Sequence, residues 1–570
     1  MAPPVRWLLV LCVVTLFLGL GRSAVTDSDE AFYAESARQM VESGDWLTPH
    51  YNAVVRFEKP VLMYWLIATA YAVGGVTEAA ARLPSALAGL ALVLLTFAVA
   101  SRWYDRPTGT LAGAIVATTF GCAVMAWQAL PDLPVTAFIT FATWALIRAL
   151  SSDGRDAGTR PVDAPGHRRA WLLAAAVASA LACLTKGPIG IVLPALVALP
   201  LACWEHRGPA GAAWRPRLPS GLTLATVAAA LGVFVAVAAP WFAAMAQVHG
   251  AAYLVRFFVG ENLTRFATPE FNDPRPFWFY LPILAGGLLP WTPFAALWVP
   301  GVARAIRTRA APQLVDLRLI VWTLAPLLFY SASIGKQPRY ILPLLPPVAI
   351  LLARSIREHL AARAEPGCAW RLRVSAAGVV AYWLALAWLM FRGAPVLAAA
   401  GMPQPLLPAT ACLGAAIALC AAVVMGRLDT APLAVVLGGA ATLLALHFQV
   451  FSPPRPSPVE RAAATLRAAW REGHTLGTYH AFGRNQIFYS GLPRLDLVTA
   501  DQTVDFLGSA APVIALIRQG DLAPLESRIA KPLRRLDRID YVDTAALRIG
   551  DLLRPDPDGV RQRILIVTNR

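Results

Sequence analysis

The sequence predicts a mainly α-helical protein that crosses a membrane many times and ends in a small α/β domain. Of its 570 residues, 57% are hydrophobic and only 15% are charged, whereas a soluble globular protein carries about 25% charged residues. Apolar runs long enough to cross about 30 Å of hydrocarbon recur through most of the chain. From Ser452 onward the apolar runs shorten and charges return. These observations divide the chain into a membrane domain, 1–451, and a soluble domain, 452–570.

Thirteen apolar segments are predicted to be membrane spans. The segment 61–76 is also apolar but short and aromatic, so it is either a fourteenth span or a helix that lies in the membrane interface. The first span is interpreted as retained, because no convincing signal-peptide cleavage site follows it. The predicted spans are 7–22, 82–102, 108–127, 133–150, 170–184, 188–203, 219–246, 278–303, 318–334, 340–354, 374–392, 405–426 and 430–450.

The distribution of arginine predicts the orientation of these spans. The net charge is +16. If 61–76 lies in the interface, the arginine-rich connections all fall on one face, which the positive-inside rule makes cytoplasmic. The first loop, 23–81, and the C-terminal domain then lie on the opposite, outer face. The arginine-rich connections are Arg102 with Arg106, 155–169, 207–217, 304–318, 354–373 and Arg427.

The C-terminal domain is predicted from short patterns. The runs "TLGTYHA", "VIALI" and "ILIVT" are typical of strands, and "PVERAAATLRAAWRE" is typical of an amphipathic helix. We find no motif in this domain to which chemistry can be attached.

An acidic stretch follows the first span. Asp29 and Glu30 begin "DEAFYAESARQMVESG", in which small or apolar positions recur at helical spacing and Gly44 suits a helix end. The pattern predicts a short amphipathic helix on the membrane surface. Its leading carboxylate, Asp29, is either a reactive group or a helix cap, because acidic side chains also stabilise helix N-termini.

Lysine is rare in this chain, and its positions are therefore informative. Only four of the 50 basic residues are lysine. Lys59 in "RFEKP", Lys186 in "TKGP" and Lys336 in "GKQPRYILP" all fall on the predicted outer face, as does Asp132 in "ALPDLP", which could also be a turn-capping aspartate. A lysine ammonium suits a phosphate oxygen, and charges at membrane depth are usually functional. Carboxylates and cations together predict a site for a lipid-linked phosphate.

The motifs supply three groups of candidate residues. Candidate catalytic residues are Asp29, Glu30 and Asp132; candidate ligands of the donor phosphate are Arg56, Lys59, Arg265, Lys336 and Arg339; other candidate substrate contacts are Tyr33, Glu58, Lys186, Glu261 and Tyr340.

The sequence offers no means of using a nucleotide. It contains neither a Walker motif nor a G-x-G-x-x-G pattern after a strand. The energy for a transfer must therefore come with the substrate, as in a polyprenyl-phosphate sugar. No cofactor and no nucleic-acid partner are expected. No metal site is expected either, with Glu58 the one residue that could contribute to a divalent-cation site.

Several motifs between residues 7 and 350 occur in the order and spacing of one family. They include "DEAFYAESARQMVESGDWLTP", "RFEKPVLMYWL", "PDLPVTAF", "LACLTKGP", "ENLTRF" and "SIGKQPRYILPLLPP". The chain resembles the membrane glycosyltransferases of the GT-C fold, which include the bacterial 4-amino-4-deoxy-L-arabinose transferase of lipid A and the protein O-mannosyltransferases. Aminoarabinose transferases commonly carry arginine where this chain has Phe32.

The resemblance implies an enzyme of the bacterial inner membrane. It would move a sugar, 4-amino-4-deoxy-L-arabinose, from undecaprenyl phosphate to lipid A on the periplasmic side, with inversion at the anomeric carbon. By position, Asp29 resembles the essential acid of the first loop, Lys59 the donor-phosphate lysine and Asp132 the acid of the second loop. Glu58 stands beside the lysine, and Arg265 and Lys336 resemble further phosphate contacts.

The identity of the acceptor changes the role expected of Asp29. With a hydroxyl of a glycan or protein, Asp29 acts as general base. A lipid A phosphate is already ionised, and Asp29 then orients the acceptor, binds the sugar amine or stabilises the oxocarbenium ion. A different class of function, transport of a lipid-linked substrate, is the distant alternative, because no repeated halves with broken helices are visible.

Overall fold

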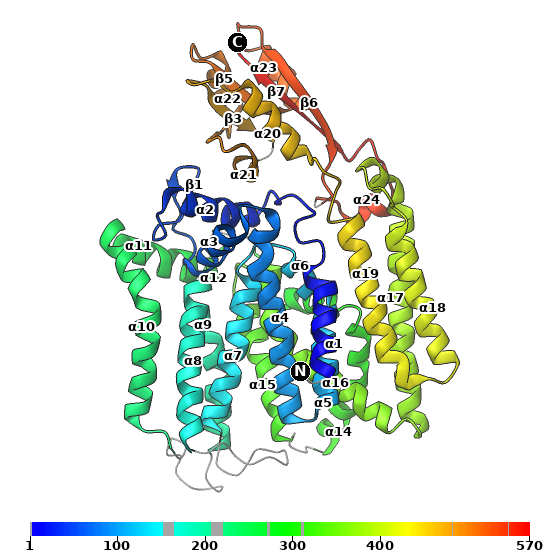
Figure 1. Cartoon of the computed structure of the whole chain (residues 1–570). Helices are drawn as coiled ribbons and strands as arrows, with labels where there is room; N and C mark the ends of the chain where they lie inside the picture. The colour runs from blue at the N-terminus through cyan, green and yellow to red at the C-terminus, as the bar shows by residue number, and fades with distance from the viewer. Residues whose placement is uncertain are drawn as a thin grey trace.

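The computed structural model describes residues 3–151, 165–206, 221–270, 274–308, 313–481, 483–544 and 546–570. It is a bundle of long helices with a smaller α/β domain standing on one end (Figure 1). The short elements α2 and α3 lie between the bundle and this domain. The predicted fold class, a polytopic helical protein with a C-terminal α/β domain, is confirmed. The predicted loops 155–169 and 207–217 lie largely outside the described residues.

Among the described helices, nine are long and apolar enough to cross a membrane, or eleven if each of two bent pairs counts as one span. The bent pairs break by 59° and 110°. Each of the thirteen predicted segments coincides with one of these or with a shorter apolar helix. The nine are α4 (Glu78–Trp103), α7 (Asp132–Leu150), α8 (Pro165–Lys186), α10 (Leu224–His249), α15 (Leu314–Ala332), η5 with α16 (Pro338–Ala361), α17 (Pro366–Ala399), α18 (Leu407–Val424) and η6 with α19 (Leu428–Gln449); the pairs are α5 (Arg106–Thr118) with α6 (Phe120–Ala126), and Phe277–Gly287 with Thr292–Ala303; shorter ones are α1 with η1 (Pro3–Phe17) and α9 (Ile189–Glu205).

Helix α3 (Leu62–Gly74) resolves the choice left open for 61–76. Its 13 residues extend about 20 Å at 1.5 Å per residue, too short for about 30 Å of hydrocarbon. It lies beside α2 (Asp29–Ser43) at the end of the bundle (Figure 1). The stacked rings of Tyr33 and Tyr64, 4.9 Å between centroids, join the two helices. The length and position of α3 favour the interfacial interpretation.

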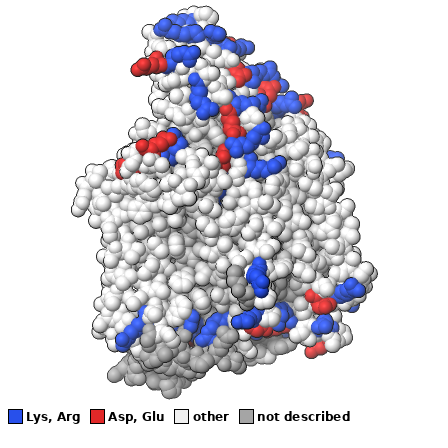
Figure 2. All heavy atoms as spheres, viewed as in Figure 1, with Lys and Arg blue, Asp and Glu red and all other residues white. Residues whose placement is uncertain are grey.

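Charged side chains gather at the two ends of the bundle and are few between them. Figure 2 shows lysine, arginine and carboxylates over the C-terminal domain and at the opposite end, with a broad apolar band between them. Few charges lie inside this band. The Arg318–Glu205 ion pair lies at the end of the bundle opposite the C-terminal domain, where α9 ends and α15 begins, and it is fully buried with N–O distances of 2.9 and 3.0 Å. The band has the composition expected of a surface in contact with lipid tails.

The C-terminal domain is built on a five-stranded sheet of order β4-β3-β5-β7-β6. The strands β4, β3 and β5 are parallel, whereas β7 runs antiparallel between β5 and β6. Alternate residues of β5 pack into two separate apolar cores, so both faces of the sheet are covered. The elements are β3 (Thr475–Tyr479), β4 (Leu495–Asp496), β5 (Val513–Arg518), β6 (Arg534–Val542) and β7 (Arg561–Thr568), with α20 (Pro458–Ala469), α21 (Gln486–Ser490), α22 (Ala500–Gly508), α23 (Gln519–Glu526) and α24 (Ile549–Leu553).

The three predicted strands correspond to β3, β5 and β7, and the predicted helix corresponds to α20. The sequence pattern missed β6, which reads "RRLDRIDYV". This strand lies at the edge of the sheet and pairs only with β7. An edge strand tolerates a high content of charged residues, so no apolar run marks it in the sequence.

Close packing of α5 against α4 gives a test of the bundle. A Cβ atom at Gly109 would lie 2.0 Å from the Ser101 hydroxyl and 2.6 Å from the Phe97 carbonyl oxygen. We expect Gly109→Leu to destabilise the protein by about 1–3 kcal/mol or more, because overpacking forces the helices apart. Thermal unfolding in detergent measures the effect. At Gly414 a Cβ would meet nothing within 4 Å, so Gly414→Leu is the control, and equal melting temperatures for the two variants would contradict the packing.

Candidate functional site

Four charged side chains from four elements meet where the bundle faces the C-terminal domain. Asp29 begins α2, Asp132 begins α7, Lys186 ends α8 and Arg339 lies in η5 (Pro338–Leu344). Arg339 pairs with the carboxylate of Asp29 and lies 3.6 Å from that of Asp132. Lys186 donates to Asp132 at 2.5 Å. We call these residues the Asp29 cluster. It joins predicted catalytic residues with a predicted phosphate ligand and a predicted substrate contact.

Asp29 is not the cap of its helix. The hydroxyl of Ser28 accepts the backbone N–H of Glu30 and is the N-cap of α2. Burial raises the pKa of Asp29, but the positive charges of Arg339, Arg484 and Arg56 lower it by more. The pKa of Asp29 therefore lies below the ordinary value. The capping alternative for Asp29 is therefore wrong, and the side chain is an ionised carboxylate directed at cations.

Asp132 is likewise not a turn cap. It follows the N-cap residue Pro131, and no side-chain cap bond forms there. The carboxylate is 2% exposed, and its two oxygens pair with Lys186 and Arg339. The ring of Tyr340 covers the ammonium of Lys186 at 4.7 Å.

A second set of charges lies beside the first. Lys59 is 3.6 Å from the carboxylate of Glu261, and Arg265 donates to the same carboxylate at 2.6 Å. We call these residues the Lys59 cluster. Burial lowers the pKa of Lys59 to about 8, and the neighbouring cations Arg265, Lys186 and Arg56 contribute, whereas Glu261 opposes them. Lys59 thus lies within electrostatic reach of the Asp29 cluster.

A third set is built around an aromatic ring. The guanidinium of Arg56 lies 3.9 Å, and that of Arg484 5.0 Å, from the centroid of Phe32. Arg56 also donates to the Tyr64 hydroxyl at 3.1 Å and lies 3.7 Å from the Glu58 carboxylate. We call Phe32, Arg56, Glu58 and Arg484 the Phe32 cluster. Arg484 comes from the C-terminal domain, and its Nη1 is 3.9 Å from Asp29.

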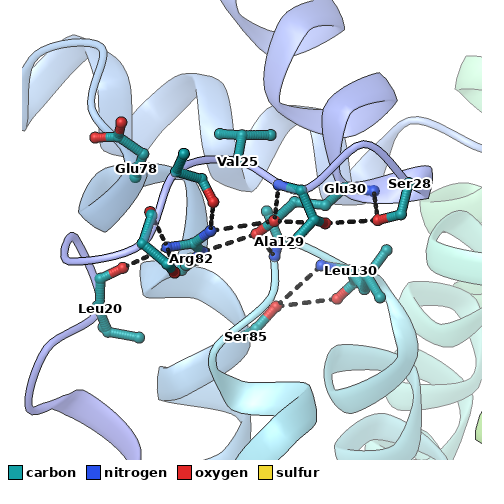
Figure 3. Close-up of polar contacts among 12 residues, drawn as sticks. Leu20, Val25, Ser28, Glu30, Glu78, Arg82, Ser85, Ala129 and Leu130 are labelled. Carbon is teal, nitrogen blue, oxygen red and sulfur yellow. Dashed lines mark hydrogen bonds and ion pairs between the residues drawn. The ribbon is translucent and has the colours of Figure 1, made fainter. Parts of the chain in front are cut away.

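Glu30 faces away from these clusters. Its carboxylate is fully buried and binds the guanidinium of Arg82 at 2.8 and 3.1 Å. It also accepts the backbone N–H groups of Thr26 and Ala129, at 2.8 and 2.9 Å (Figure 3). Burial raises the pKa of Glu30, but these partners lower it by more, so the pKa lies below the ordinary value. The geometry assigns Glu30 to the framework, and its predicted catalytic role has no support from its position.

Arg82 completes this buried network from α4. Besides Glu30, it donates to the carbonyl oxygens of Leu20, Ser23 and Ala24 at 2.8, 2.8 and 2.9 Å (Figure 3). Arg82 was not among the site residues predicted from the sequence, although the motif "ARLPSALAGL" places one arginine at the start of an apolar span. A charge in that position was the available signal, because it must find buried partners.

Lys336 is the predicted phosphate ligand that the structure places differently. Its ammonium contacts the backbone carbonyl oxygens of Ser333 and Arg275. It is 5% exposed, and no ion pair to a described carboxylate is seen. Its role toward phosphate stays a prediction. Also within the described ranges, no group of three or more histidine, cysteine or acidic residues could hold a metal ion.

An apolar cavity of about 700 Å³ opens beside the Asp29 cluster. Arg339 is the charged residue in its lining, which otherwise consists mainly of apolar side chains from the bent helix pairs, η5 and α17. A cavity of this kind fits a hydrocarbon chain whose polar end meets Arg339.

Comparisons with known proteins agree with the resemblance found in the sequence. A family model described as dolichyl-phosphate-mannose-protein mannosyltransferase matches residues 7–254. The undecaprenyl phosphate-α-4-amino-4-deoxy-L-arabinose arabinosyl transferase of Pseudomonas paraeruginosa is 36% identical over 359 residues, 62% of this chain and 60% of that protein. A second enzyme of this name, from Pseudomonas fluorescens, is 34% identical over 64% of this chain and 61% of its own length. The chain thus aligns with about three fifths of these relatives.

A solved structure shares the fold over almost the whole chain. The crystal structure of ArnT from Cupriavidus metallidurans bound to undecaprenyl phosphate superposes with a TM-score of 0.73, at 22% identity, over 99% of this chain and 98% of that one. The chain therefore has the fold of this protein, C-terminal domain included. The predicted resemblance to aminoarabinose transferases is confirmed.

The buried pair gives a test of what holds the site. We expect Glu30→Gln to lower the free energy of unfolding by about 3–5 kcal/mol, because it leaves the Arg82 guanidinium buried without a counter-charge. Glu42→Gln is the matched control: Glu42 lies on the same helix, pairs with Arg38 and is 55% exposed, and a surface pair contributes about 1 kcal/mol or less. Thermal unfolding of both variants in detergent decides, and similar melting temperatures would exclude a framework role for Glu30.

Proposed function

We propose that this protein is a glycosyltransferase that moves 4-amino-4-deoxy-L-arabinose from undecaprenyl phosphate to a phosphate of lipid A. The observation that carries the proposal is the meeting of two carboxylates, Asp29 and Asp132, with the cations Lys186, Arg339 and Arg484 beside an apolar cavity. Such a site suits a substrate that is anionic at one end and hydrocarbon at the other. The similarity to named aminoarabinose transferases supports this sugar and this carrier.

Different residues of the chain carry out different parts of the reaction. Lys59 and Arg265 bind the phosphate of the donor and stabilise the negative charge that it gains as it leaves. An oxygen of the acceptor phosphate attacks C1 of the sugar while the bond between C1 and the donor phosphate oxygen breaks. Undecaprenyl phosphate departs, and the configuration at C1 inverts. No proton moves, because the acceptor is already ionised.

Asp29 acts as a fixed negative charge in this reaction. Positive charge develops on the sugar ring as the bond to the leaving phosphate stretches, and an ionised carboxylate stabilises it. Arg339 holds both Asp29 and Asp132, so the two carboxylates keep a fixed position relative to each other. If the acceptor were a hydroxyl, the same ionised Asp29 would serve as general base.

The site is proposed to lie on the periplasmic side of the inner membrane. It lies at the end of the bundle that carries the C-terminal domain (Figure 1). The short arginine-bearing connections near Arg102, Arg106 and Arg357 lie at the other end, and the positive-inside rule assigns that end to the cytoplasm.

The substrates are tested by mass spectrometry of lipid A from cells with and without this gene. We expect the mass increment of aminoarabinose to be lost on deletion and restored by the wild-type gene. We expect Asp29→Asn not to restore it, although this variant folds normally because Ser28 caps α2. Asp45→Asn is the control in the same loop, since asparagine can still accept the N–H groups of Leu47 and Thr48. Unchanged lipid A after deletion would refute the acceptor, and restoration by Asp29→Asn would refute the role of Asp29.

The pKa of Lys59, about 8, predicts an alkaline limit to donor use. The ammonium is present below this pH and lost above it, whereas the donor is a phosphodiester whose charge does not change in this range. We expect kcat/KM for the donor, at saturating acceptor, to fall about tenfold per unit above pH 8. In Lys59→Arg this limb should move to higher pH, because a guanidinium stays protonated. Identical profiles for the two proteins would show that Lys59 does not hold the phosphate.

A further inference from the structure

The C-terminal domain contributes a loop to the site, and this loop is held by its backbone. The carboxylate of Asp27 accepts the N–H groups of Gly483, Arg484 and Asn485, two of them at 3.0 and 3.1 Å. The Tyr51 hydroxyl donates to the Arg484 carbonyl at 2.8 Å. Asp27 and Tyr51 both belong to the first loop of the membrane domain. The backbone of Arg484 is therefore fixed against that domain, and its side chain starts from a defined place.

The guanidinium of Arg484 points into the site rather than into the domain that carries it. It lies 3.9 Å from the Asp29 carboxylate and 5.0 Å from the Phe32 ring. The side chain is 48% exposed, so donors remain available to a ligand. Arg484 and Arg56 approach the same ring, which leaves two guanidinium groups near one carboxylate.

The ion pairs of the three clusters leave positive charge over. Counted among the described residues, six cations meet four carboxylates in these ion pairs, and the Asp27 carboxylate on the backbone of Arg484 is a fifth, which leaves a formal surplus of one positive charge. The cations are Arg56, Lys59, Lys186, Arg265, Arg339 and Arg484, and the carboxylates are Asp29, Glu58, Asp132 and Glu261. A partly exposed cation surplus attracts an anion.

The two ends of the site differ in the phosphate that they suit. Lys59 and Arg265 share Glu261 in the Lys59 cluster, whereas Arg484 lies with Arg56 beside Asp29. Paired guanidinium groups with planar donors suit the several oxygens of a phosphate monoester. Arg484 belongs to the C-terminal domain, which stands beyond the apolar band of the bundle, where a bulky headgroup outside the bilayer would lie.

We propose that Arg484, together with Arg56, forms a binding subsite for a phosphate monoester of the acceptor, and that the C-terminal domain is thereby part of the active site. This inference rests on the proposed function and assigns the acceptor half of it. Arg484 supplies a cation beside Phe32.

The test compares variants of the purified full-length protein in liposomes. We expect Arg484→Ala to raise the KM for lipid A about tenfold to a hundredfold, since a hydrogen bond to a charged group is lost, and to leave the KM for the undecaprenyl-phosphate sugar unchanged. Arg484→Lys should recover part of the loss. Arg528→Ala is the matched control, because Arg528 lies on the same domain, is also 48% exposed and also pairs with an aspartate. Arg484→Gln replaces Arg484→Ala if the alanine variant does not fold.

The outcomes separate this inference from the proposed function. Wild-type protein that transfers no sugar to lipid A would overturn the function itself. Wild-type transfer with an unchanged acceptor KM in folded Arg484→Ala would overturn the subsite alone. A rise confined to the donor KM would overturn it too, by assigning Arg484 to the donor phosphate. A rise confined to the acceptor KM, absent in Arg528→Ala, supports it.

Discussion

The buried ion pair between Glu30 and Arg82 is the constraint on which the geometry of the site depends. Arg82 binds the carbonyl oxygens at the end of the first span, while Glu30 binds the backbone just before α7. Asp29 is the residue before Glu30, and Asp132 follows Ala129 by three positions. One desolvated pair therefore fixes both carboxylates of the Asp29 cluster relative to α4. Such a pair adds little net stability, but either charge alone would be costly in this interior.

Much of the membrane fold could be predicted from the sequence because lipid imposes a simple rule on it. Each apolar run had to be a helix of restricted length, because hydrocarbon offers no hydrogen-bond partners to an irregular backbone. The same rule does not operate in the C-terminal domain, where β6 carries charges at a sheet edge and leaves no apolar signal. The motifs also indicated which polar segments meet, although they are far apart in the chain: Asp29, Asp132 and Arg339 do come together.

The individual partners could not be predicted in the same way. Asp29 and Glu30 are neighbours in sequence and similar in chemistry, but successive residues of a helix point about 100° apart, so one faces the cations and the other the interior. Which of the two does so depends on the rotation of α2, and that is fixed by Arg82 from another helix. Arg484 is separated from Asp29 by most of the chain and is one of many arginines. Only its place in three dimensions distinguishes it from the others.

The attachment of the 483–485 loop has a consequence for how this architecture can vary. Asp27 recognises main-chain N–H groups, which every residue except proline possesses. The docking of the domain is therefore indifferent to the side chain presented at position 484, while that side chain remains directed at the reacting groups. A change there alters what the site recognises without loosening the joint or touching Glu30 and Arg82. The fold thus separates a joint that depends on main-chain groups, the contacts of Asp27, from a side chain at position 484 that can change without breaking that joint.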